Sequence, residues 1–219
     1  MVSLIICQCR IFNPAINRGL KWFNALDDES NESTLLTNNI TQKAQYTSVS
    51  LYSYFTKNFI ISKAKIPLNY SLTFNGQYSK DELYGSEQLF VGGFYTVRGF
   101  RNTSIGGDKG YNVRNEIKYD FRNLFTSNNA VKYIPTFITN TLSKTSITPF
   151  FDYGYVKSNA INQVGNEITG TGVKLDFNGK NIASSLVWAK SLSVPLSLIE
   201  EHKTKDGNDV IYFSLKWEM

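Results

Sequence analysis

Residues that build metal centres and catalytic triads are scarce in this sequence. Its 219 residues contain two cysteines and one histidine. Cys7 and Cys9 are one residue apart, a spacing that rarely allows a disulfide between them, and two thiols are too few for a structural zinc site. We therefore expect two incidental thiols, no bound metal and no cofactor.

Long hydrophobic runs are absent. The longest stretch without a charged residue, 66–79, has 14 residues, of which six are polar. A membrane-spanning helix needs about 20 mostly apolar residues, whereas a transmembrane β-strand needs only about 9–11, with alternate residues polar. The first seven residues lack a basic segment and do not predict a secretory signal. The sequence excludes a helical membrane protein and leaves a β-barrel open.

The chain has few charges, and they are mixed in sign. Charged residues make up 19% of the chain, against roughly 25% in typical soluble domains. Aromatic residues make up 14%, which favours a folded protein, since disordered chains are poor in them. The net charge of +5 forms no basic patch along 111–122, where the signs alternate, so we predict no nucleic-acid partner.

Alternation of apolar and polar residues is the dominant pattern. It is clearest in 68–79, 111–122 and 211–219, and weaker versions cover 45–57, 147–157, 167–178 and 181–190. A period of two residues predicts β-strands. Polar or turn-like linkers separate the segments, and no segment has a persuasive helical period. We predict an all-β, antiparallel fold with eight to ten strands, and a less regular path over the first 44 residues.

Many alternating strands fit either a soluble sandwich or barrel, or a transmembrane barrel. Three features favour the membrane. The apolar faces are rich in Tyr, Phe and Trp, which suit the interfacial girdles of membrane proteins. The alternation lasts 10–12 residues, longer than the usual strand of about 5–6 in soluble proteins. The chain also ends within an alternating strand whose aromatic residues share one face.

The segment 87–110 does not follow the pattern of an ordinary strand. Gly92 and Gly93 predict a bend or a close backbone approach. Val97–Phe100 place one positive charge, Arg98, among apolar neighbours, and a turn-rich link follows at 105–110. Taken alone, the segment is a glycine-rich loop.

Three motifs in this order resemble a known family. They are EQLFVGGFYTVRGF (87–100), GGDKGYNVRNEI (106–117) and PFFDYGYV (149–156). Together they resemble the barrel of the Omp85 superfamily, and within it the two-partner-secretion transporters of the ShlB/FhaC/HecB type, also called haemolysin activation/secretion proteins. The resemblance covers roughly residues 45–219.

The resemblance implies roles for individual residues. In that family a long extracellular loop folds back into the barrel and carries the VRGF tetrapeptide at its tip, here Val97, Arg98, Gly99 and Phe100. An aromatic-x-Asp-x-Gly motif on a later strand matches Phe150, Asp152 and Gly154. The resemblance implies that Arg98 pairs with Asp152 in the lumen. Residues expected to line the lumen are Arg114, Glu116, Lys118 and Lys174.

Elementary chemistry supports this pairing independently of the family. Alternation over 147–157 places Asp152 with Thr148 and Gly154, opposite Phe151 and Tyr153. If the aromatic residues face lipid, Asp152 faces the lumen, where an ionisable residue needs a partner. An arginine offers a planar fork that matches a carboxylate. The alternative is that Asp152 lines a wet wall and Arg98 is an ordinary loop charge.

The resemblance also implies that the chain is part of a larger protein. The family barrel has sixteen strands and follows periplasmic POTRA domains. We expect an irregular segment at 1–44, which could belong to an upstream strand and loop, and the C-terminal half of the barrel at 45–219, with loop 87–110 folded inward. A fragment is favoured over a smaller closed barrel. The chain ends in Met219 where the family usually has an aromatic residue, although Phe213 and Trp217 keep the outward pattern.

These observations bear on four functions. The favoured one is an outer-membrane pore that translocates and activates a large secreted exoprotein, such as a haemolysin or adhesin, and that meets outer-membrane lipid and the barrel-assembly machinery. The alternative within the same superfamily is an insertase for other outer-membrane proteins. A hydrolase is disfavoured because catalysis needs a histidine, and His202 lies between two charged residues. A soluble nucleic-acid binder is disfavoured by the mixed charges.

Overall fold

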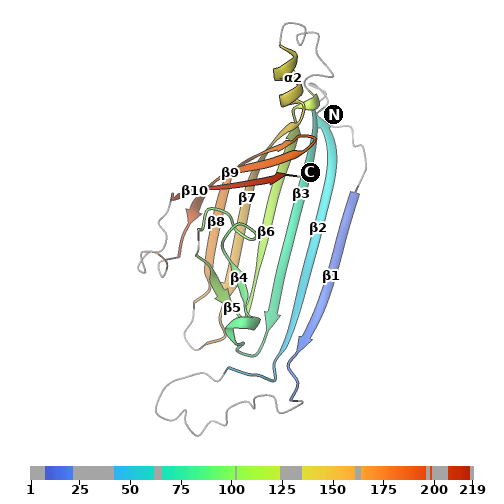
Figure 1. Ribbon diagram of the computed structural model, residues 1–219. Helices are drawn as coiled ribbons and strands as arrows, with labels where there is room; N and C mark the ends of the chain where they lie inside the picture. The colour runs from blue at the N-terminus through green and yellow to red at the C-terminus, as the bar shows by residue number, and fades with distance from the viewer. Residues whose placement is uncertain are drawn as a thin grey trace.

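The fold is an antiparallel sheet with a long loop inserted over one of its faces (Figure 1). The computed structural model describes residues 8–21, 42–61, 66–101, 103–123, 135–160, 164–195, 198 and 207–217. Within these ranges the sheet has eight strands, in the order β1-β2-β3-β6-β7-β8-β9-β10. Their bounds are Gln8–Arg18 (β1), Thr47–Ile61 (β2), Ile66–Ser79 (β3), Lys109–Asp120 (β6), Thr145–Lys157 (β7), Asn166–Asn178 (β8), Ile182–Ser193 (β9) and Asp209–Trp217 (β10).

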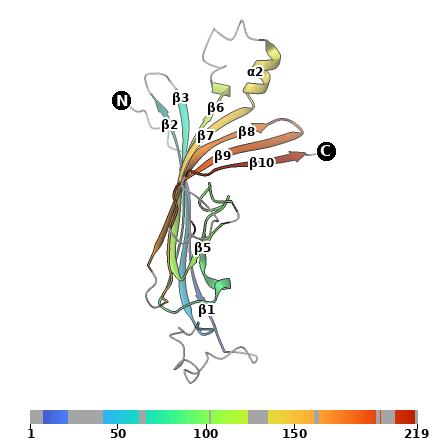
Figure 2. The same cartoon turned by 90° about the vertical axis from the view of Figure 1, so that its left-hand side faces the viewer.

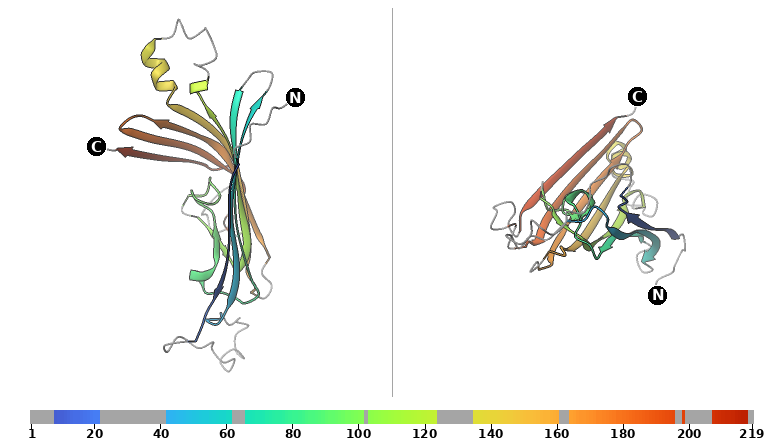
Figure 3. Two further views of the ribbon diagram at one scale, coloured as in Figure 1. Left: turned by 90° about the vertical axis from the view of Figure 1, so that its right-hand side faces the viewer. Right: turned by 90° about the horizontal axis from the view of Figure 1, so that it is seen from below.

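Each strand of the sheet pairs with the next one along the chain, except that residues 80–108 intervene between β3 and β6. We call these residues the inserted loop. It contains a short 3-10 turn, η2 (Gly85–Glu87), and a hairpin of β4 (Leu89–Val91) and β5 (Ile105–Gly107). Views at right angles show this hairpin on the side toward which β8–β10 bend (Figures 2 and 3). We call the sheet face beneath the inserted loop the inner face, and the opposite face the outer face.

The strands are long for a soluble protein. The shortest strand of the sheet, β10, has 9 residues and the longest, β2, has 15, whereas strands of soluble proteins usually have about 5–6. A strand of about 9–11 tilted residues crosses a membrane. In the described part of the sheet the register shifts once, between Thr169 and Gly170 of β8.

Buried polar side chains on one face and exposed large apolar side chains on the other distinguish this sheet from that of a soluble protein. On the inner face of β7, Ser146, Thr148 and Asp152 are buried. On the outer face of β9 and β10, Trp188 is 45% exposed and Trp217 is 72% exposed. A soluble protein rarely exposes a large continuous apolar surface, whereas a membrane barrel turns an apolar face to lipid and a polar face to its lumen.

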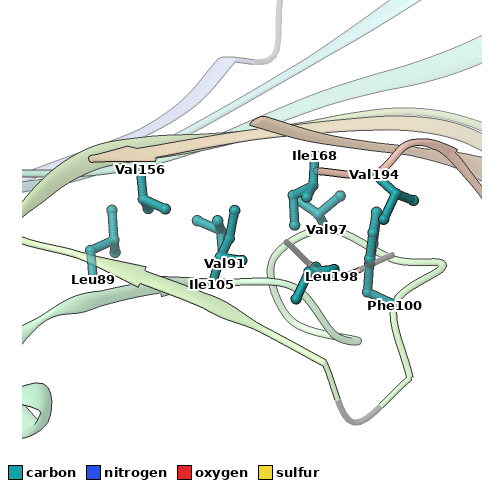
Figure 4. Close-up of a cluster of buried hydrophobic side chains, with 9 residues drawn as sticks. All are labelled: Leu89, Val91, Val97, Phe100, Ile105, Val156, Ile168, Val194 and Leu198. Atoms are coloured by element: carbon teal, nitrogen blue, oxygen red, sulfur yellow. The ribbon is translucent and has the colours of Figure 1, made fainter. Parts of the chain in front are cut away.

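Apolar packing joins the inserted loop to the inner face (Figure 4). The inserted loop covers part of the inner face and excludes water from it. Apolar side chains of the loop and of the sheet therefore pack against one another there. The cluster takes Leu89, Val91, Val97, Phe100 and Ile105 from the loop, Val156 and Ile168 from β7 and β8, and Val194 and Leu198 from the chain after β9. The loop is therefore held down by a core of its own.

The structure confirms the all-β antiparallel fold class, and its strands coincide with the alternating segments. β1 lies within 1–44, the segment for which the sequence predicts a less regular path that could include an upstream strand, and it pairs with β2 over its whole length. The adjacent apolar residues Ile11 and Phe12 and the proline at Pro14 obscure its alternation. β1 is at an edge of the described sheet, where a proline is tolerated because an outward N–H has no ladder partner.

A short helix, α2 (Thr136–Leu142), precedes β7 and was not predicted. Its seven residues make about two turns, too few for a helical period to be read, and none of them is buried. In the described ranges, no helix has the length and apolar character needed to cross a membrane.

We predict that the core beneath the inserted loop stabilises the fold. Ile168→Ala should lower the free energy of unfolding by about 2–5 kcal/mol, because Ile168 is fully buried and its truncation leaves a cavity. The matched control is Ile182→Ala on the outer face, where Ile182 is 48% exposed. Urea unfolding in detergent measures both variants, and equal losses would contradict the assignment of the core.

Candidate functional site

The tip of the inserted loop sits on the inner face of β7, β8 and β9. The side chains of Val97, Arg98 and Phe100 are all at most 1% exposed. Val97 packs against the backbone of β7 at Gly154, where an added Cβ would lie 2.9 Å from Val97 Cγ2. Gly99 has a φ of 101° and lies against the backbone of Ser191 in β9. A non-glycine residue there would be strained, so the VRGF turn needs its glycine.

The bend predicted at the start of the tip is present. Gly92 and Gly93 have φ angles of 121° and 97°, both in the left-handed region. Thr96 closes the bend, since its Oγ1 accepts a hydrogen bond from the Gly92 amide at 2.8 Å. The chain then turns down toward the sheet, and this places Arg98 above β7.

Arg98 and Asp152 form a buried bidentate ion pair. Arg98 Nε lies 2.6 Å from Asp152 Oδ2, and Arg98 Nη2 lies 2.7 Å from Oδ1. The backbone amide of Arg98 also donates to Oδ2, at 3.1 Å. Both side chains are inaccessible to solvent, at 1% and 0% exposure. Two nitrogens of the guanidinium donate to the two oxygens of the carboxylate, which is the bidentate geometry that arginine offers and lysine does not.

Two further side chains of the sheet complete the surroundings of Arg98. Its Nη1 lies 2.7 Å from Glu116 Oε1 on β6. Its Cζ lies 3.4 Å from the centre of the Phe150 ring, so the guanidinium stacks on that ring. Arg98 therefore contacts two carboxylates and one aromatic face, on two neighbouring strands.

Arg114 balances the charge of this group. It is directly opposite Asp152 in the β6–β7 register, and its Nη2 lies 3.1 Å from Glu116 Oε1. Its Nη1 donates to the backbone oxygen of Tyr95 in the inserted loop, at 3.2 Å. We call Arg98, Arg114, Glu116 and Asp152 the ion cluster. Two arginines and two carboxylates make it neutral as a whole.

The other two residues expected to line the lumen lie outside the ion cluster. Lys118 pairs with Asp120 at 3.3 Å, and Lys174 pairs with Asp176 at 3.0 Å. Both pairs join residues two apart on the inner face of one strand. The first pair is exposed and the second is partly exposed, so both contribute little to stability. They give the inner face its polar character away from the loop. His202, Cys7 and Met219 lie outside the described residues.

Sequence reasoning assigned no role to Asp108, whose carboxylate is fully buried at the base of the inserted loop. It accepts hydrogen bonds from the loop and from the chain after β7. Its neighbour Glu82 is affected, since burial and the charge of Asp108 raise the pKa of the Glu82 carboxyl. The available signal was an acidic residue inside the turn-rich run GGDKG, where a carboxylate can satisfy several backbone N–H groups.

A second contact ties the base of the inserted loop to the start of β2. The hydroxyl of Tyr46 donates to Glu87 Oε2 at 2.5 Å. This hydrogen bond, which needs the proton, raises the pKa of Tyr46 to about 12. The Tyr46 hydroxyl therefore keeps the proton that it donates until the pH approaches about 12.

The arrangement holds the inserted loop in position on the inner face. In the part of the chain that the structure describes, no group of three His, Cys, Asp or Glu side chains could hold a metal ion. Each charged side chain of the ion cluster forms an ion pair with another member of the cluster. The contacts of the ion cluster attach the inserted loop to β6 and β7.

The comparisons with known proteins identify the family. The family described as "Haemolysin secretion/activation protein ShlB/FhaC/HecB" matches residues 10–177. This chain belongs to that family. The match runs from within β1 to within β8 and includes the inserted loop and every member of the ion cluster.

Curated relatives are similar over parts of the chain. The outer membrane transporter CdiB of Dickeya dadantii is 36% identical over 115 residues, which are 49% of this chain and 17% of the relative. The hemolysin transporter protein HpmB of Proteus mirabilis is 29% identical over 110 residues, or 50% of this chain and 18% of the relative. The heme/hemopexin transporter protein HuxB of Haemophilus influenzae is 25% identical over 183 residues. The chain thus spans less than a third of each of these relatives.

A solved structure has the same fold. The structure of CdiB from Escherichia coli superimposes with a TM-score of 0.70 at 20% sequence identity, over 96% of this chain and 33% of the CdiB chain. CdiB from Acinetobacter baumannii superimposes with a TM-score of 0.59 over 79% of this chain. The sheet and its inserted loop are therefore a portion of the CdiB fold.

We predict that the loop tip requires a glycine beneath it on β8. A Cβ at Gly170 would collide with the backbone oxygen of Arg98, so Gly170→Ala should displace the tip at a cost of about 1–3 kcal/mol. Trypsin cleavage after Arg98, which is 1% exposed in the seated loop, should become detectable. Gly85→Ala is the control, since a Cβ there meets nothing within 4 Å. An unchanged digestion pattern in Gly170→Ala would contradict the seating.

Proposed function

We propose that this chain forms part of the wall of an outer-membrane pore that exports a large secreted protein by two-partner secretion. The observation that carries the proposal is the inserted loop, seated on the polar inner face of a barrel-type wall by a buried ion cluster, in a chain of the haemolysin secretion/activation family. Pore function needs a wall, a wet path and a segment that controls the path. Each of these has a counterpart among the described residues.

The wall is the sheet itself. Its outer face exposes apolar and aromatic side chains, such as Phe151 at 46%, Ile211 at 69% and Trp217 at 72%. Lipid tails stabilise such a surface, and water does not. Outer-membrane lipid is thus the proposed surrounding, and the barrel-assembly machinery is the proposed means of insertion.

The path runs along the inner face. Polar and charged side chains follow it away from the loop, including Lys118, Lys174 and Asp176. These groups keep the surface hydrated, so that an unfolded chain can pass without being captured by a large apolar area. The proposed roles are the loop tip for Val97–Phe100, the anchor for Phe150, Asp152 and Gly154, and the lining for Arg114, Glu116 and both lysines.

The ion cluster sets the position of the inserted loop within that path. A buried pair adds little net stability relative to apolar packing, yet removal of one partner costs about 3–5 kcal/mol because it leaves an unpaired charge. Such a pair favours one location of the loop strongly over neighbouring ones. Asp152 and Glu116 together define where Arg98 can sit.

The relatives support a proposal for the class of cargo. The named relatives are transporters of the CdiB, HpmB and HuxB types. We propose that the cargo is a large exoprotein such as a haemolysin or adhesin, and that the chain itself performs no chemical reaction. The insertase alternative lacks such support, because the matching family and these relatives are secretion proteins and transporters.

Export in the host bacterium tests this proposal. Deletion of the gene should remove one large protein from the culture medium, and the wild-type gene should restore it. Asp152→Ala should reduce the exported protein by about tenfold or more, because a cost of only about 1.4 kcal/mol shifts an equilibrium tenfold. The control is Asp120→Asn, which removes an exposed carboxylate on β6 and should leave export unchanged.

Mass spectrometry of the medium measures the amount, and immunoblotting of membranes verifies equal insertion of each variant. A medium proteome that is identical with and without the gene would overturn the export function. Full export by Asp152→Ala would overturn the role of the anchor and leave the export function standing.

A further inference from the structure

The carboxylate of Asp108 joins two separate segments of the chain. Its Oδ1 accepts hydrogen bonds from the Leu83 amide at 2.8 Å and from Gln88 Nε2 at 3.2 Å, both in the inserted loop. Its Oδ2 accepts from the Ser158 hydroxyl at 3.1 Å and from the Asn159 amide at 2.6 Å, both directly after β7. Each oxygen therefore serves one segment.

Asn159 extends this junction to the end of β3. Its Nδ2 donates to the backbone oxygen of Ser79 at 3.1 Å and to that of Asp81 at 2.9 Å. The amide of Asp108 donates to the backbone oxygen of Lys157 at 3.1 Å. Both ends of the inserted loop and the chain after β7 thus meet at one buried point.

The charge of Asp108 is held by neutral donors. Among the described residues, no ion pair includes Asp108, and its side chain is 0% exposed. A buried carboxylate that relies on neutral hydrogen bonds needs all of its donors in place, since each bond to a charged acceptor is strong and its loss is costly. The Asp108 carboxylate therefore favours one particular arrangement of the two segments that supply its donors.

This junction is separate from the ion cluster at the tip. The two groups share no residue and no hydrogen bond in the described part of the chain, and the hairpin with Leu89 and Ile105 lies between them. We propose that Asp108 is a positioning residue that latches the base of the inserted loop to the chain after β7, independently of the Arg98 anchor. Release of the tip then leaves the base in place, and the loop returns to the same site. The importance of this latch for export rests on the proposed function, whereas the latch itself rests on the contacts.

Hydrogen–deuterium exchange of the protein in detergent tests the latch. The amides of Leu83 and Asn159 donate to Asp108, and the amide of Arg98 donates to Asp152. Asp108→Asn keeps one acceptor oxygen and replaces the other by a donor, so exchange should rise about 10- to 100-fold at Leu83 or at Asn159, whichever amide faces the new NH2 group. Exchange at Arg98 should stay within about twofold of wild type, because its own acceptor is intact.

Matched variants make the result decisive. Asp152→Asn should give the reverse pattern, with faster exchange at Arg98 and unchanged exchange at 83 and 159. Asp120→Asn should change none of them. Ser158→Ala removes a single donor to Asp108 and provides a milder variant if Asp108→Asn does not fold; it should speed exchange at Asn159 and leave Arg98 unchanged.

Two results would overturn the proposal. One is a joint rise at the base and the tip in Asp108→Asn or Ser158→Ala, which would make the loop one cooperative unit. The other is unchanged exchange at the base. Neither result depends on export, so a failure of the latch is distinguishable from a failure of the pore function.

Discussion

The guanidinium of Arg98 is buried between the inserted loop and the inner face of the sheet, and it cannot lose its proton to avoid the cost of burial. It therefore has to be surrounded by negative charge and by groups that replace water. Asp152 supplies a bidentate carboxylate, Glu116 supplies a second one, and Phe150 covers the flat face of the guanidinium. These three residues lie on β6 and β7. The burial of one loop side chain therefore requires acidic and aromatic residues on the inner face of two neighbouring strands.

Burial of the loop tip also requires small residues on the part of the sheet beneath it. A loop whose backbone approaches a sheet this closely leaves no room for side chains beneath it. Gly154 and Gly170 lie under Val97 and Arg98, and the tip itself turns at Gly99 against β9. The apolar cluster around Val97 and Ile168 then excludes water, which strengthens the ion pairs by lowering the local dielectric. The ion cluster, the glycines at and beneath the tip, and the apolar cluster therefore each depend on the other two.

Much of this arrangement was predictable from the sequence. Alternation identified the strands β2, β3 and β6–β10, because a wall between lipid and water must place apolar and polar residues on opposite faces. Alternation also put Asp152 on the polar face, and the VRGF motif suggested Arg98 as its partner. The pairing is present in the structure, while its role in export remains a proposal. Glu116 was expected only to line the lumen, since the register that brings it to Arg98 is not visible in one strand alone.

Other features could not be predicted because their causes are non-local. Pro14 conceals β1, whose strand conformation depends on pairing with β2. The helix α2 is too short to show a period. Asp108 acts through backbone amides of residues 25 and 51 positions away in the chain, and backbone donors leave no trace in the identity of the residues that carry them.

A double-mutant cycle on the central ion pair tests the account most directly. Urea unfolding in detergent would be measured for Arg98→Gln, Asp152→Asn and the double variant, with Lys174→Gln and Asp176→Asn as a control cycle on a partly exposed pair. The account predicts a coupling energy of about 2–3 kcal/mol for Arg98 with Asp152, and less than about 1 kcal/mol for the control. Additive effects of the two central substitutions, with a coupling below about 0.5 kcal/mol, would contradict the claim that this pair holds the loop on the wall.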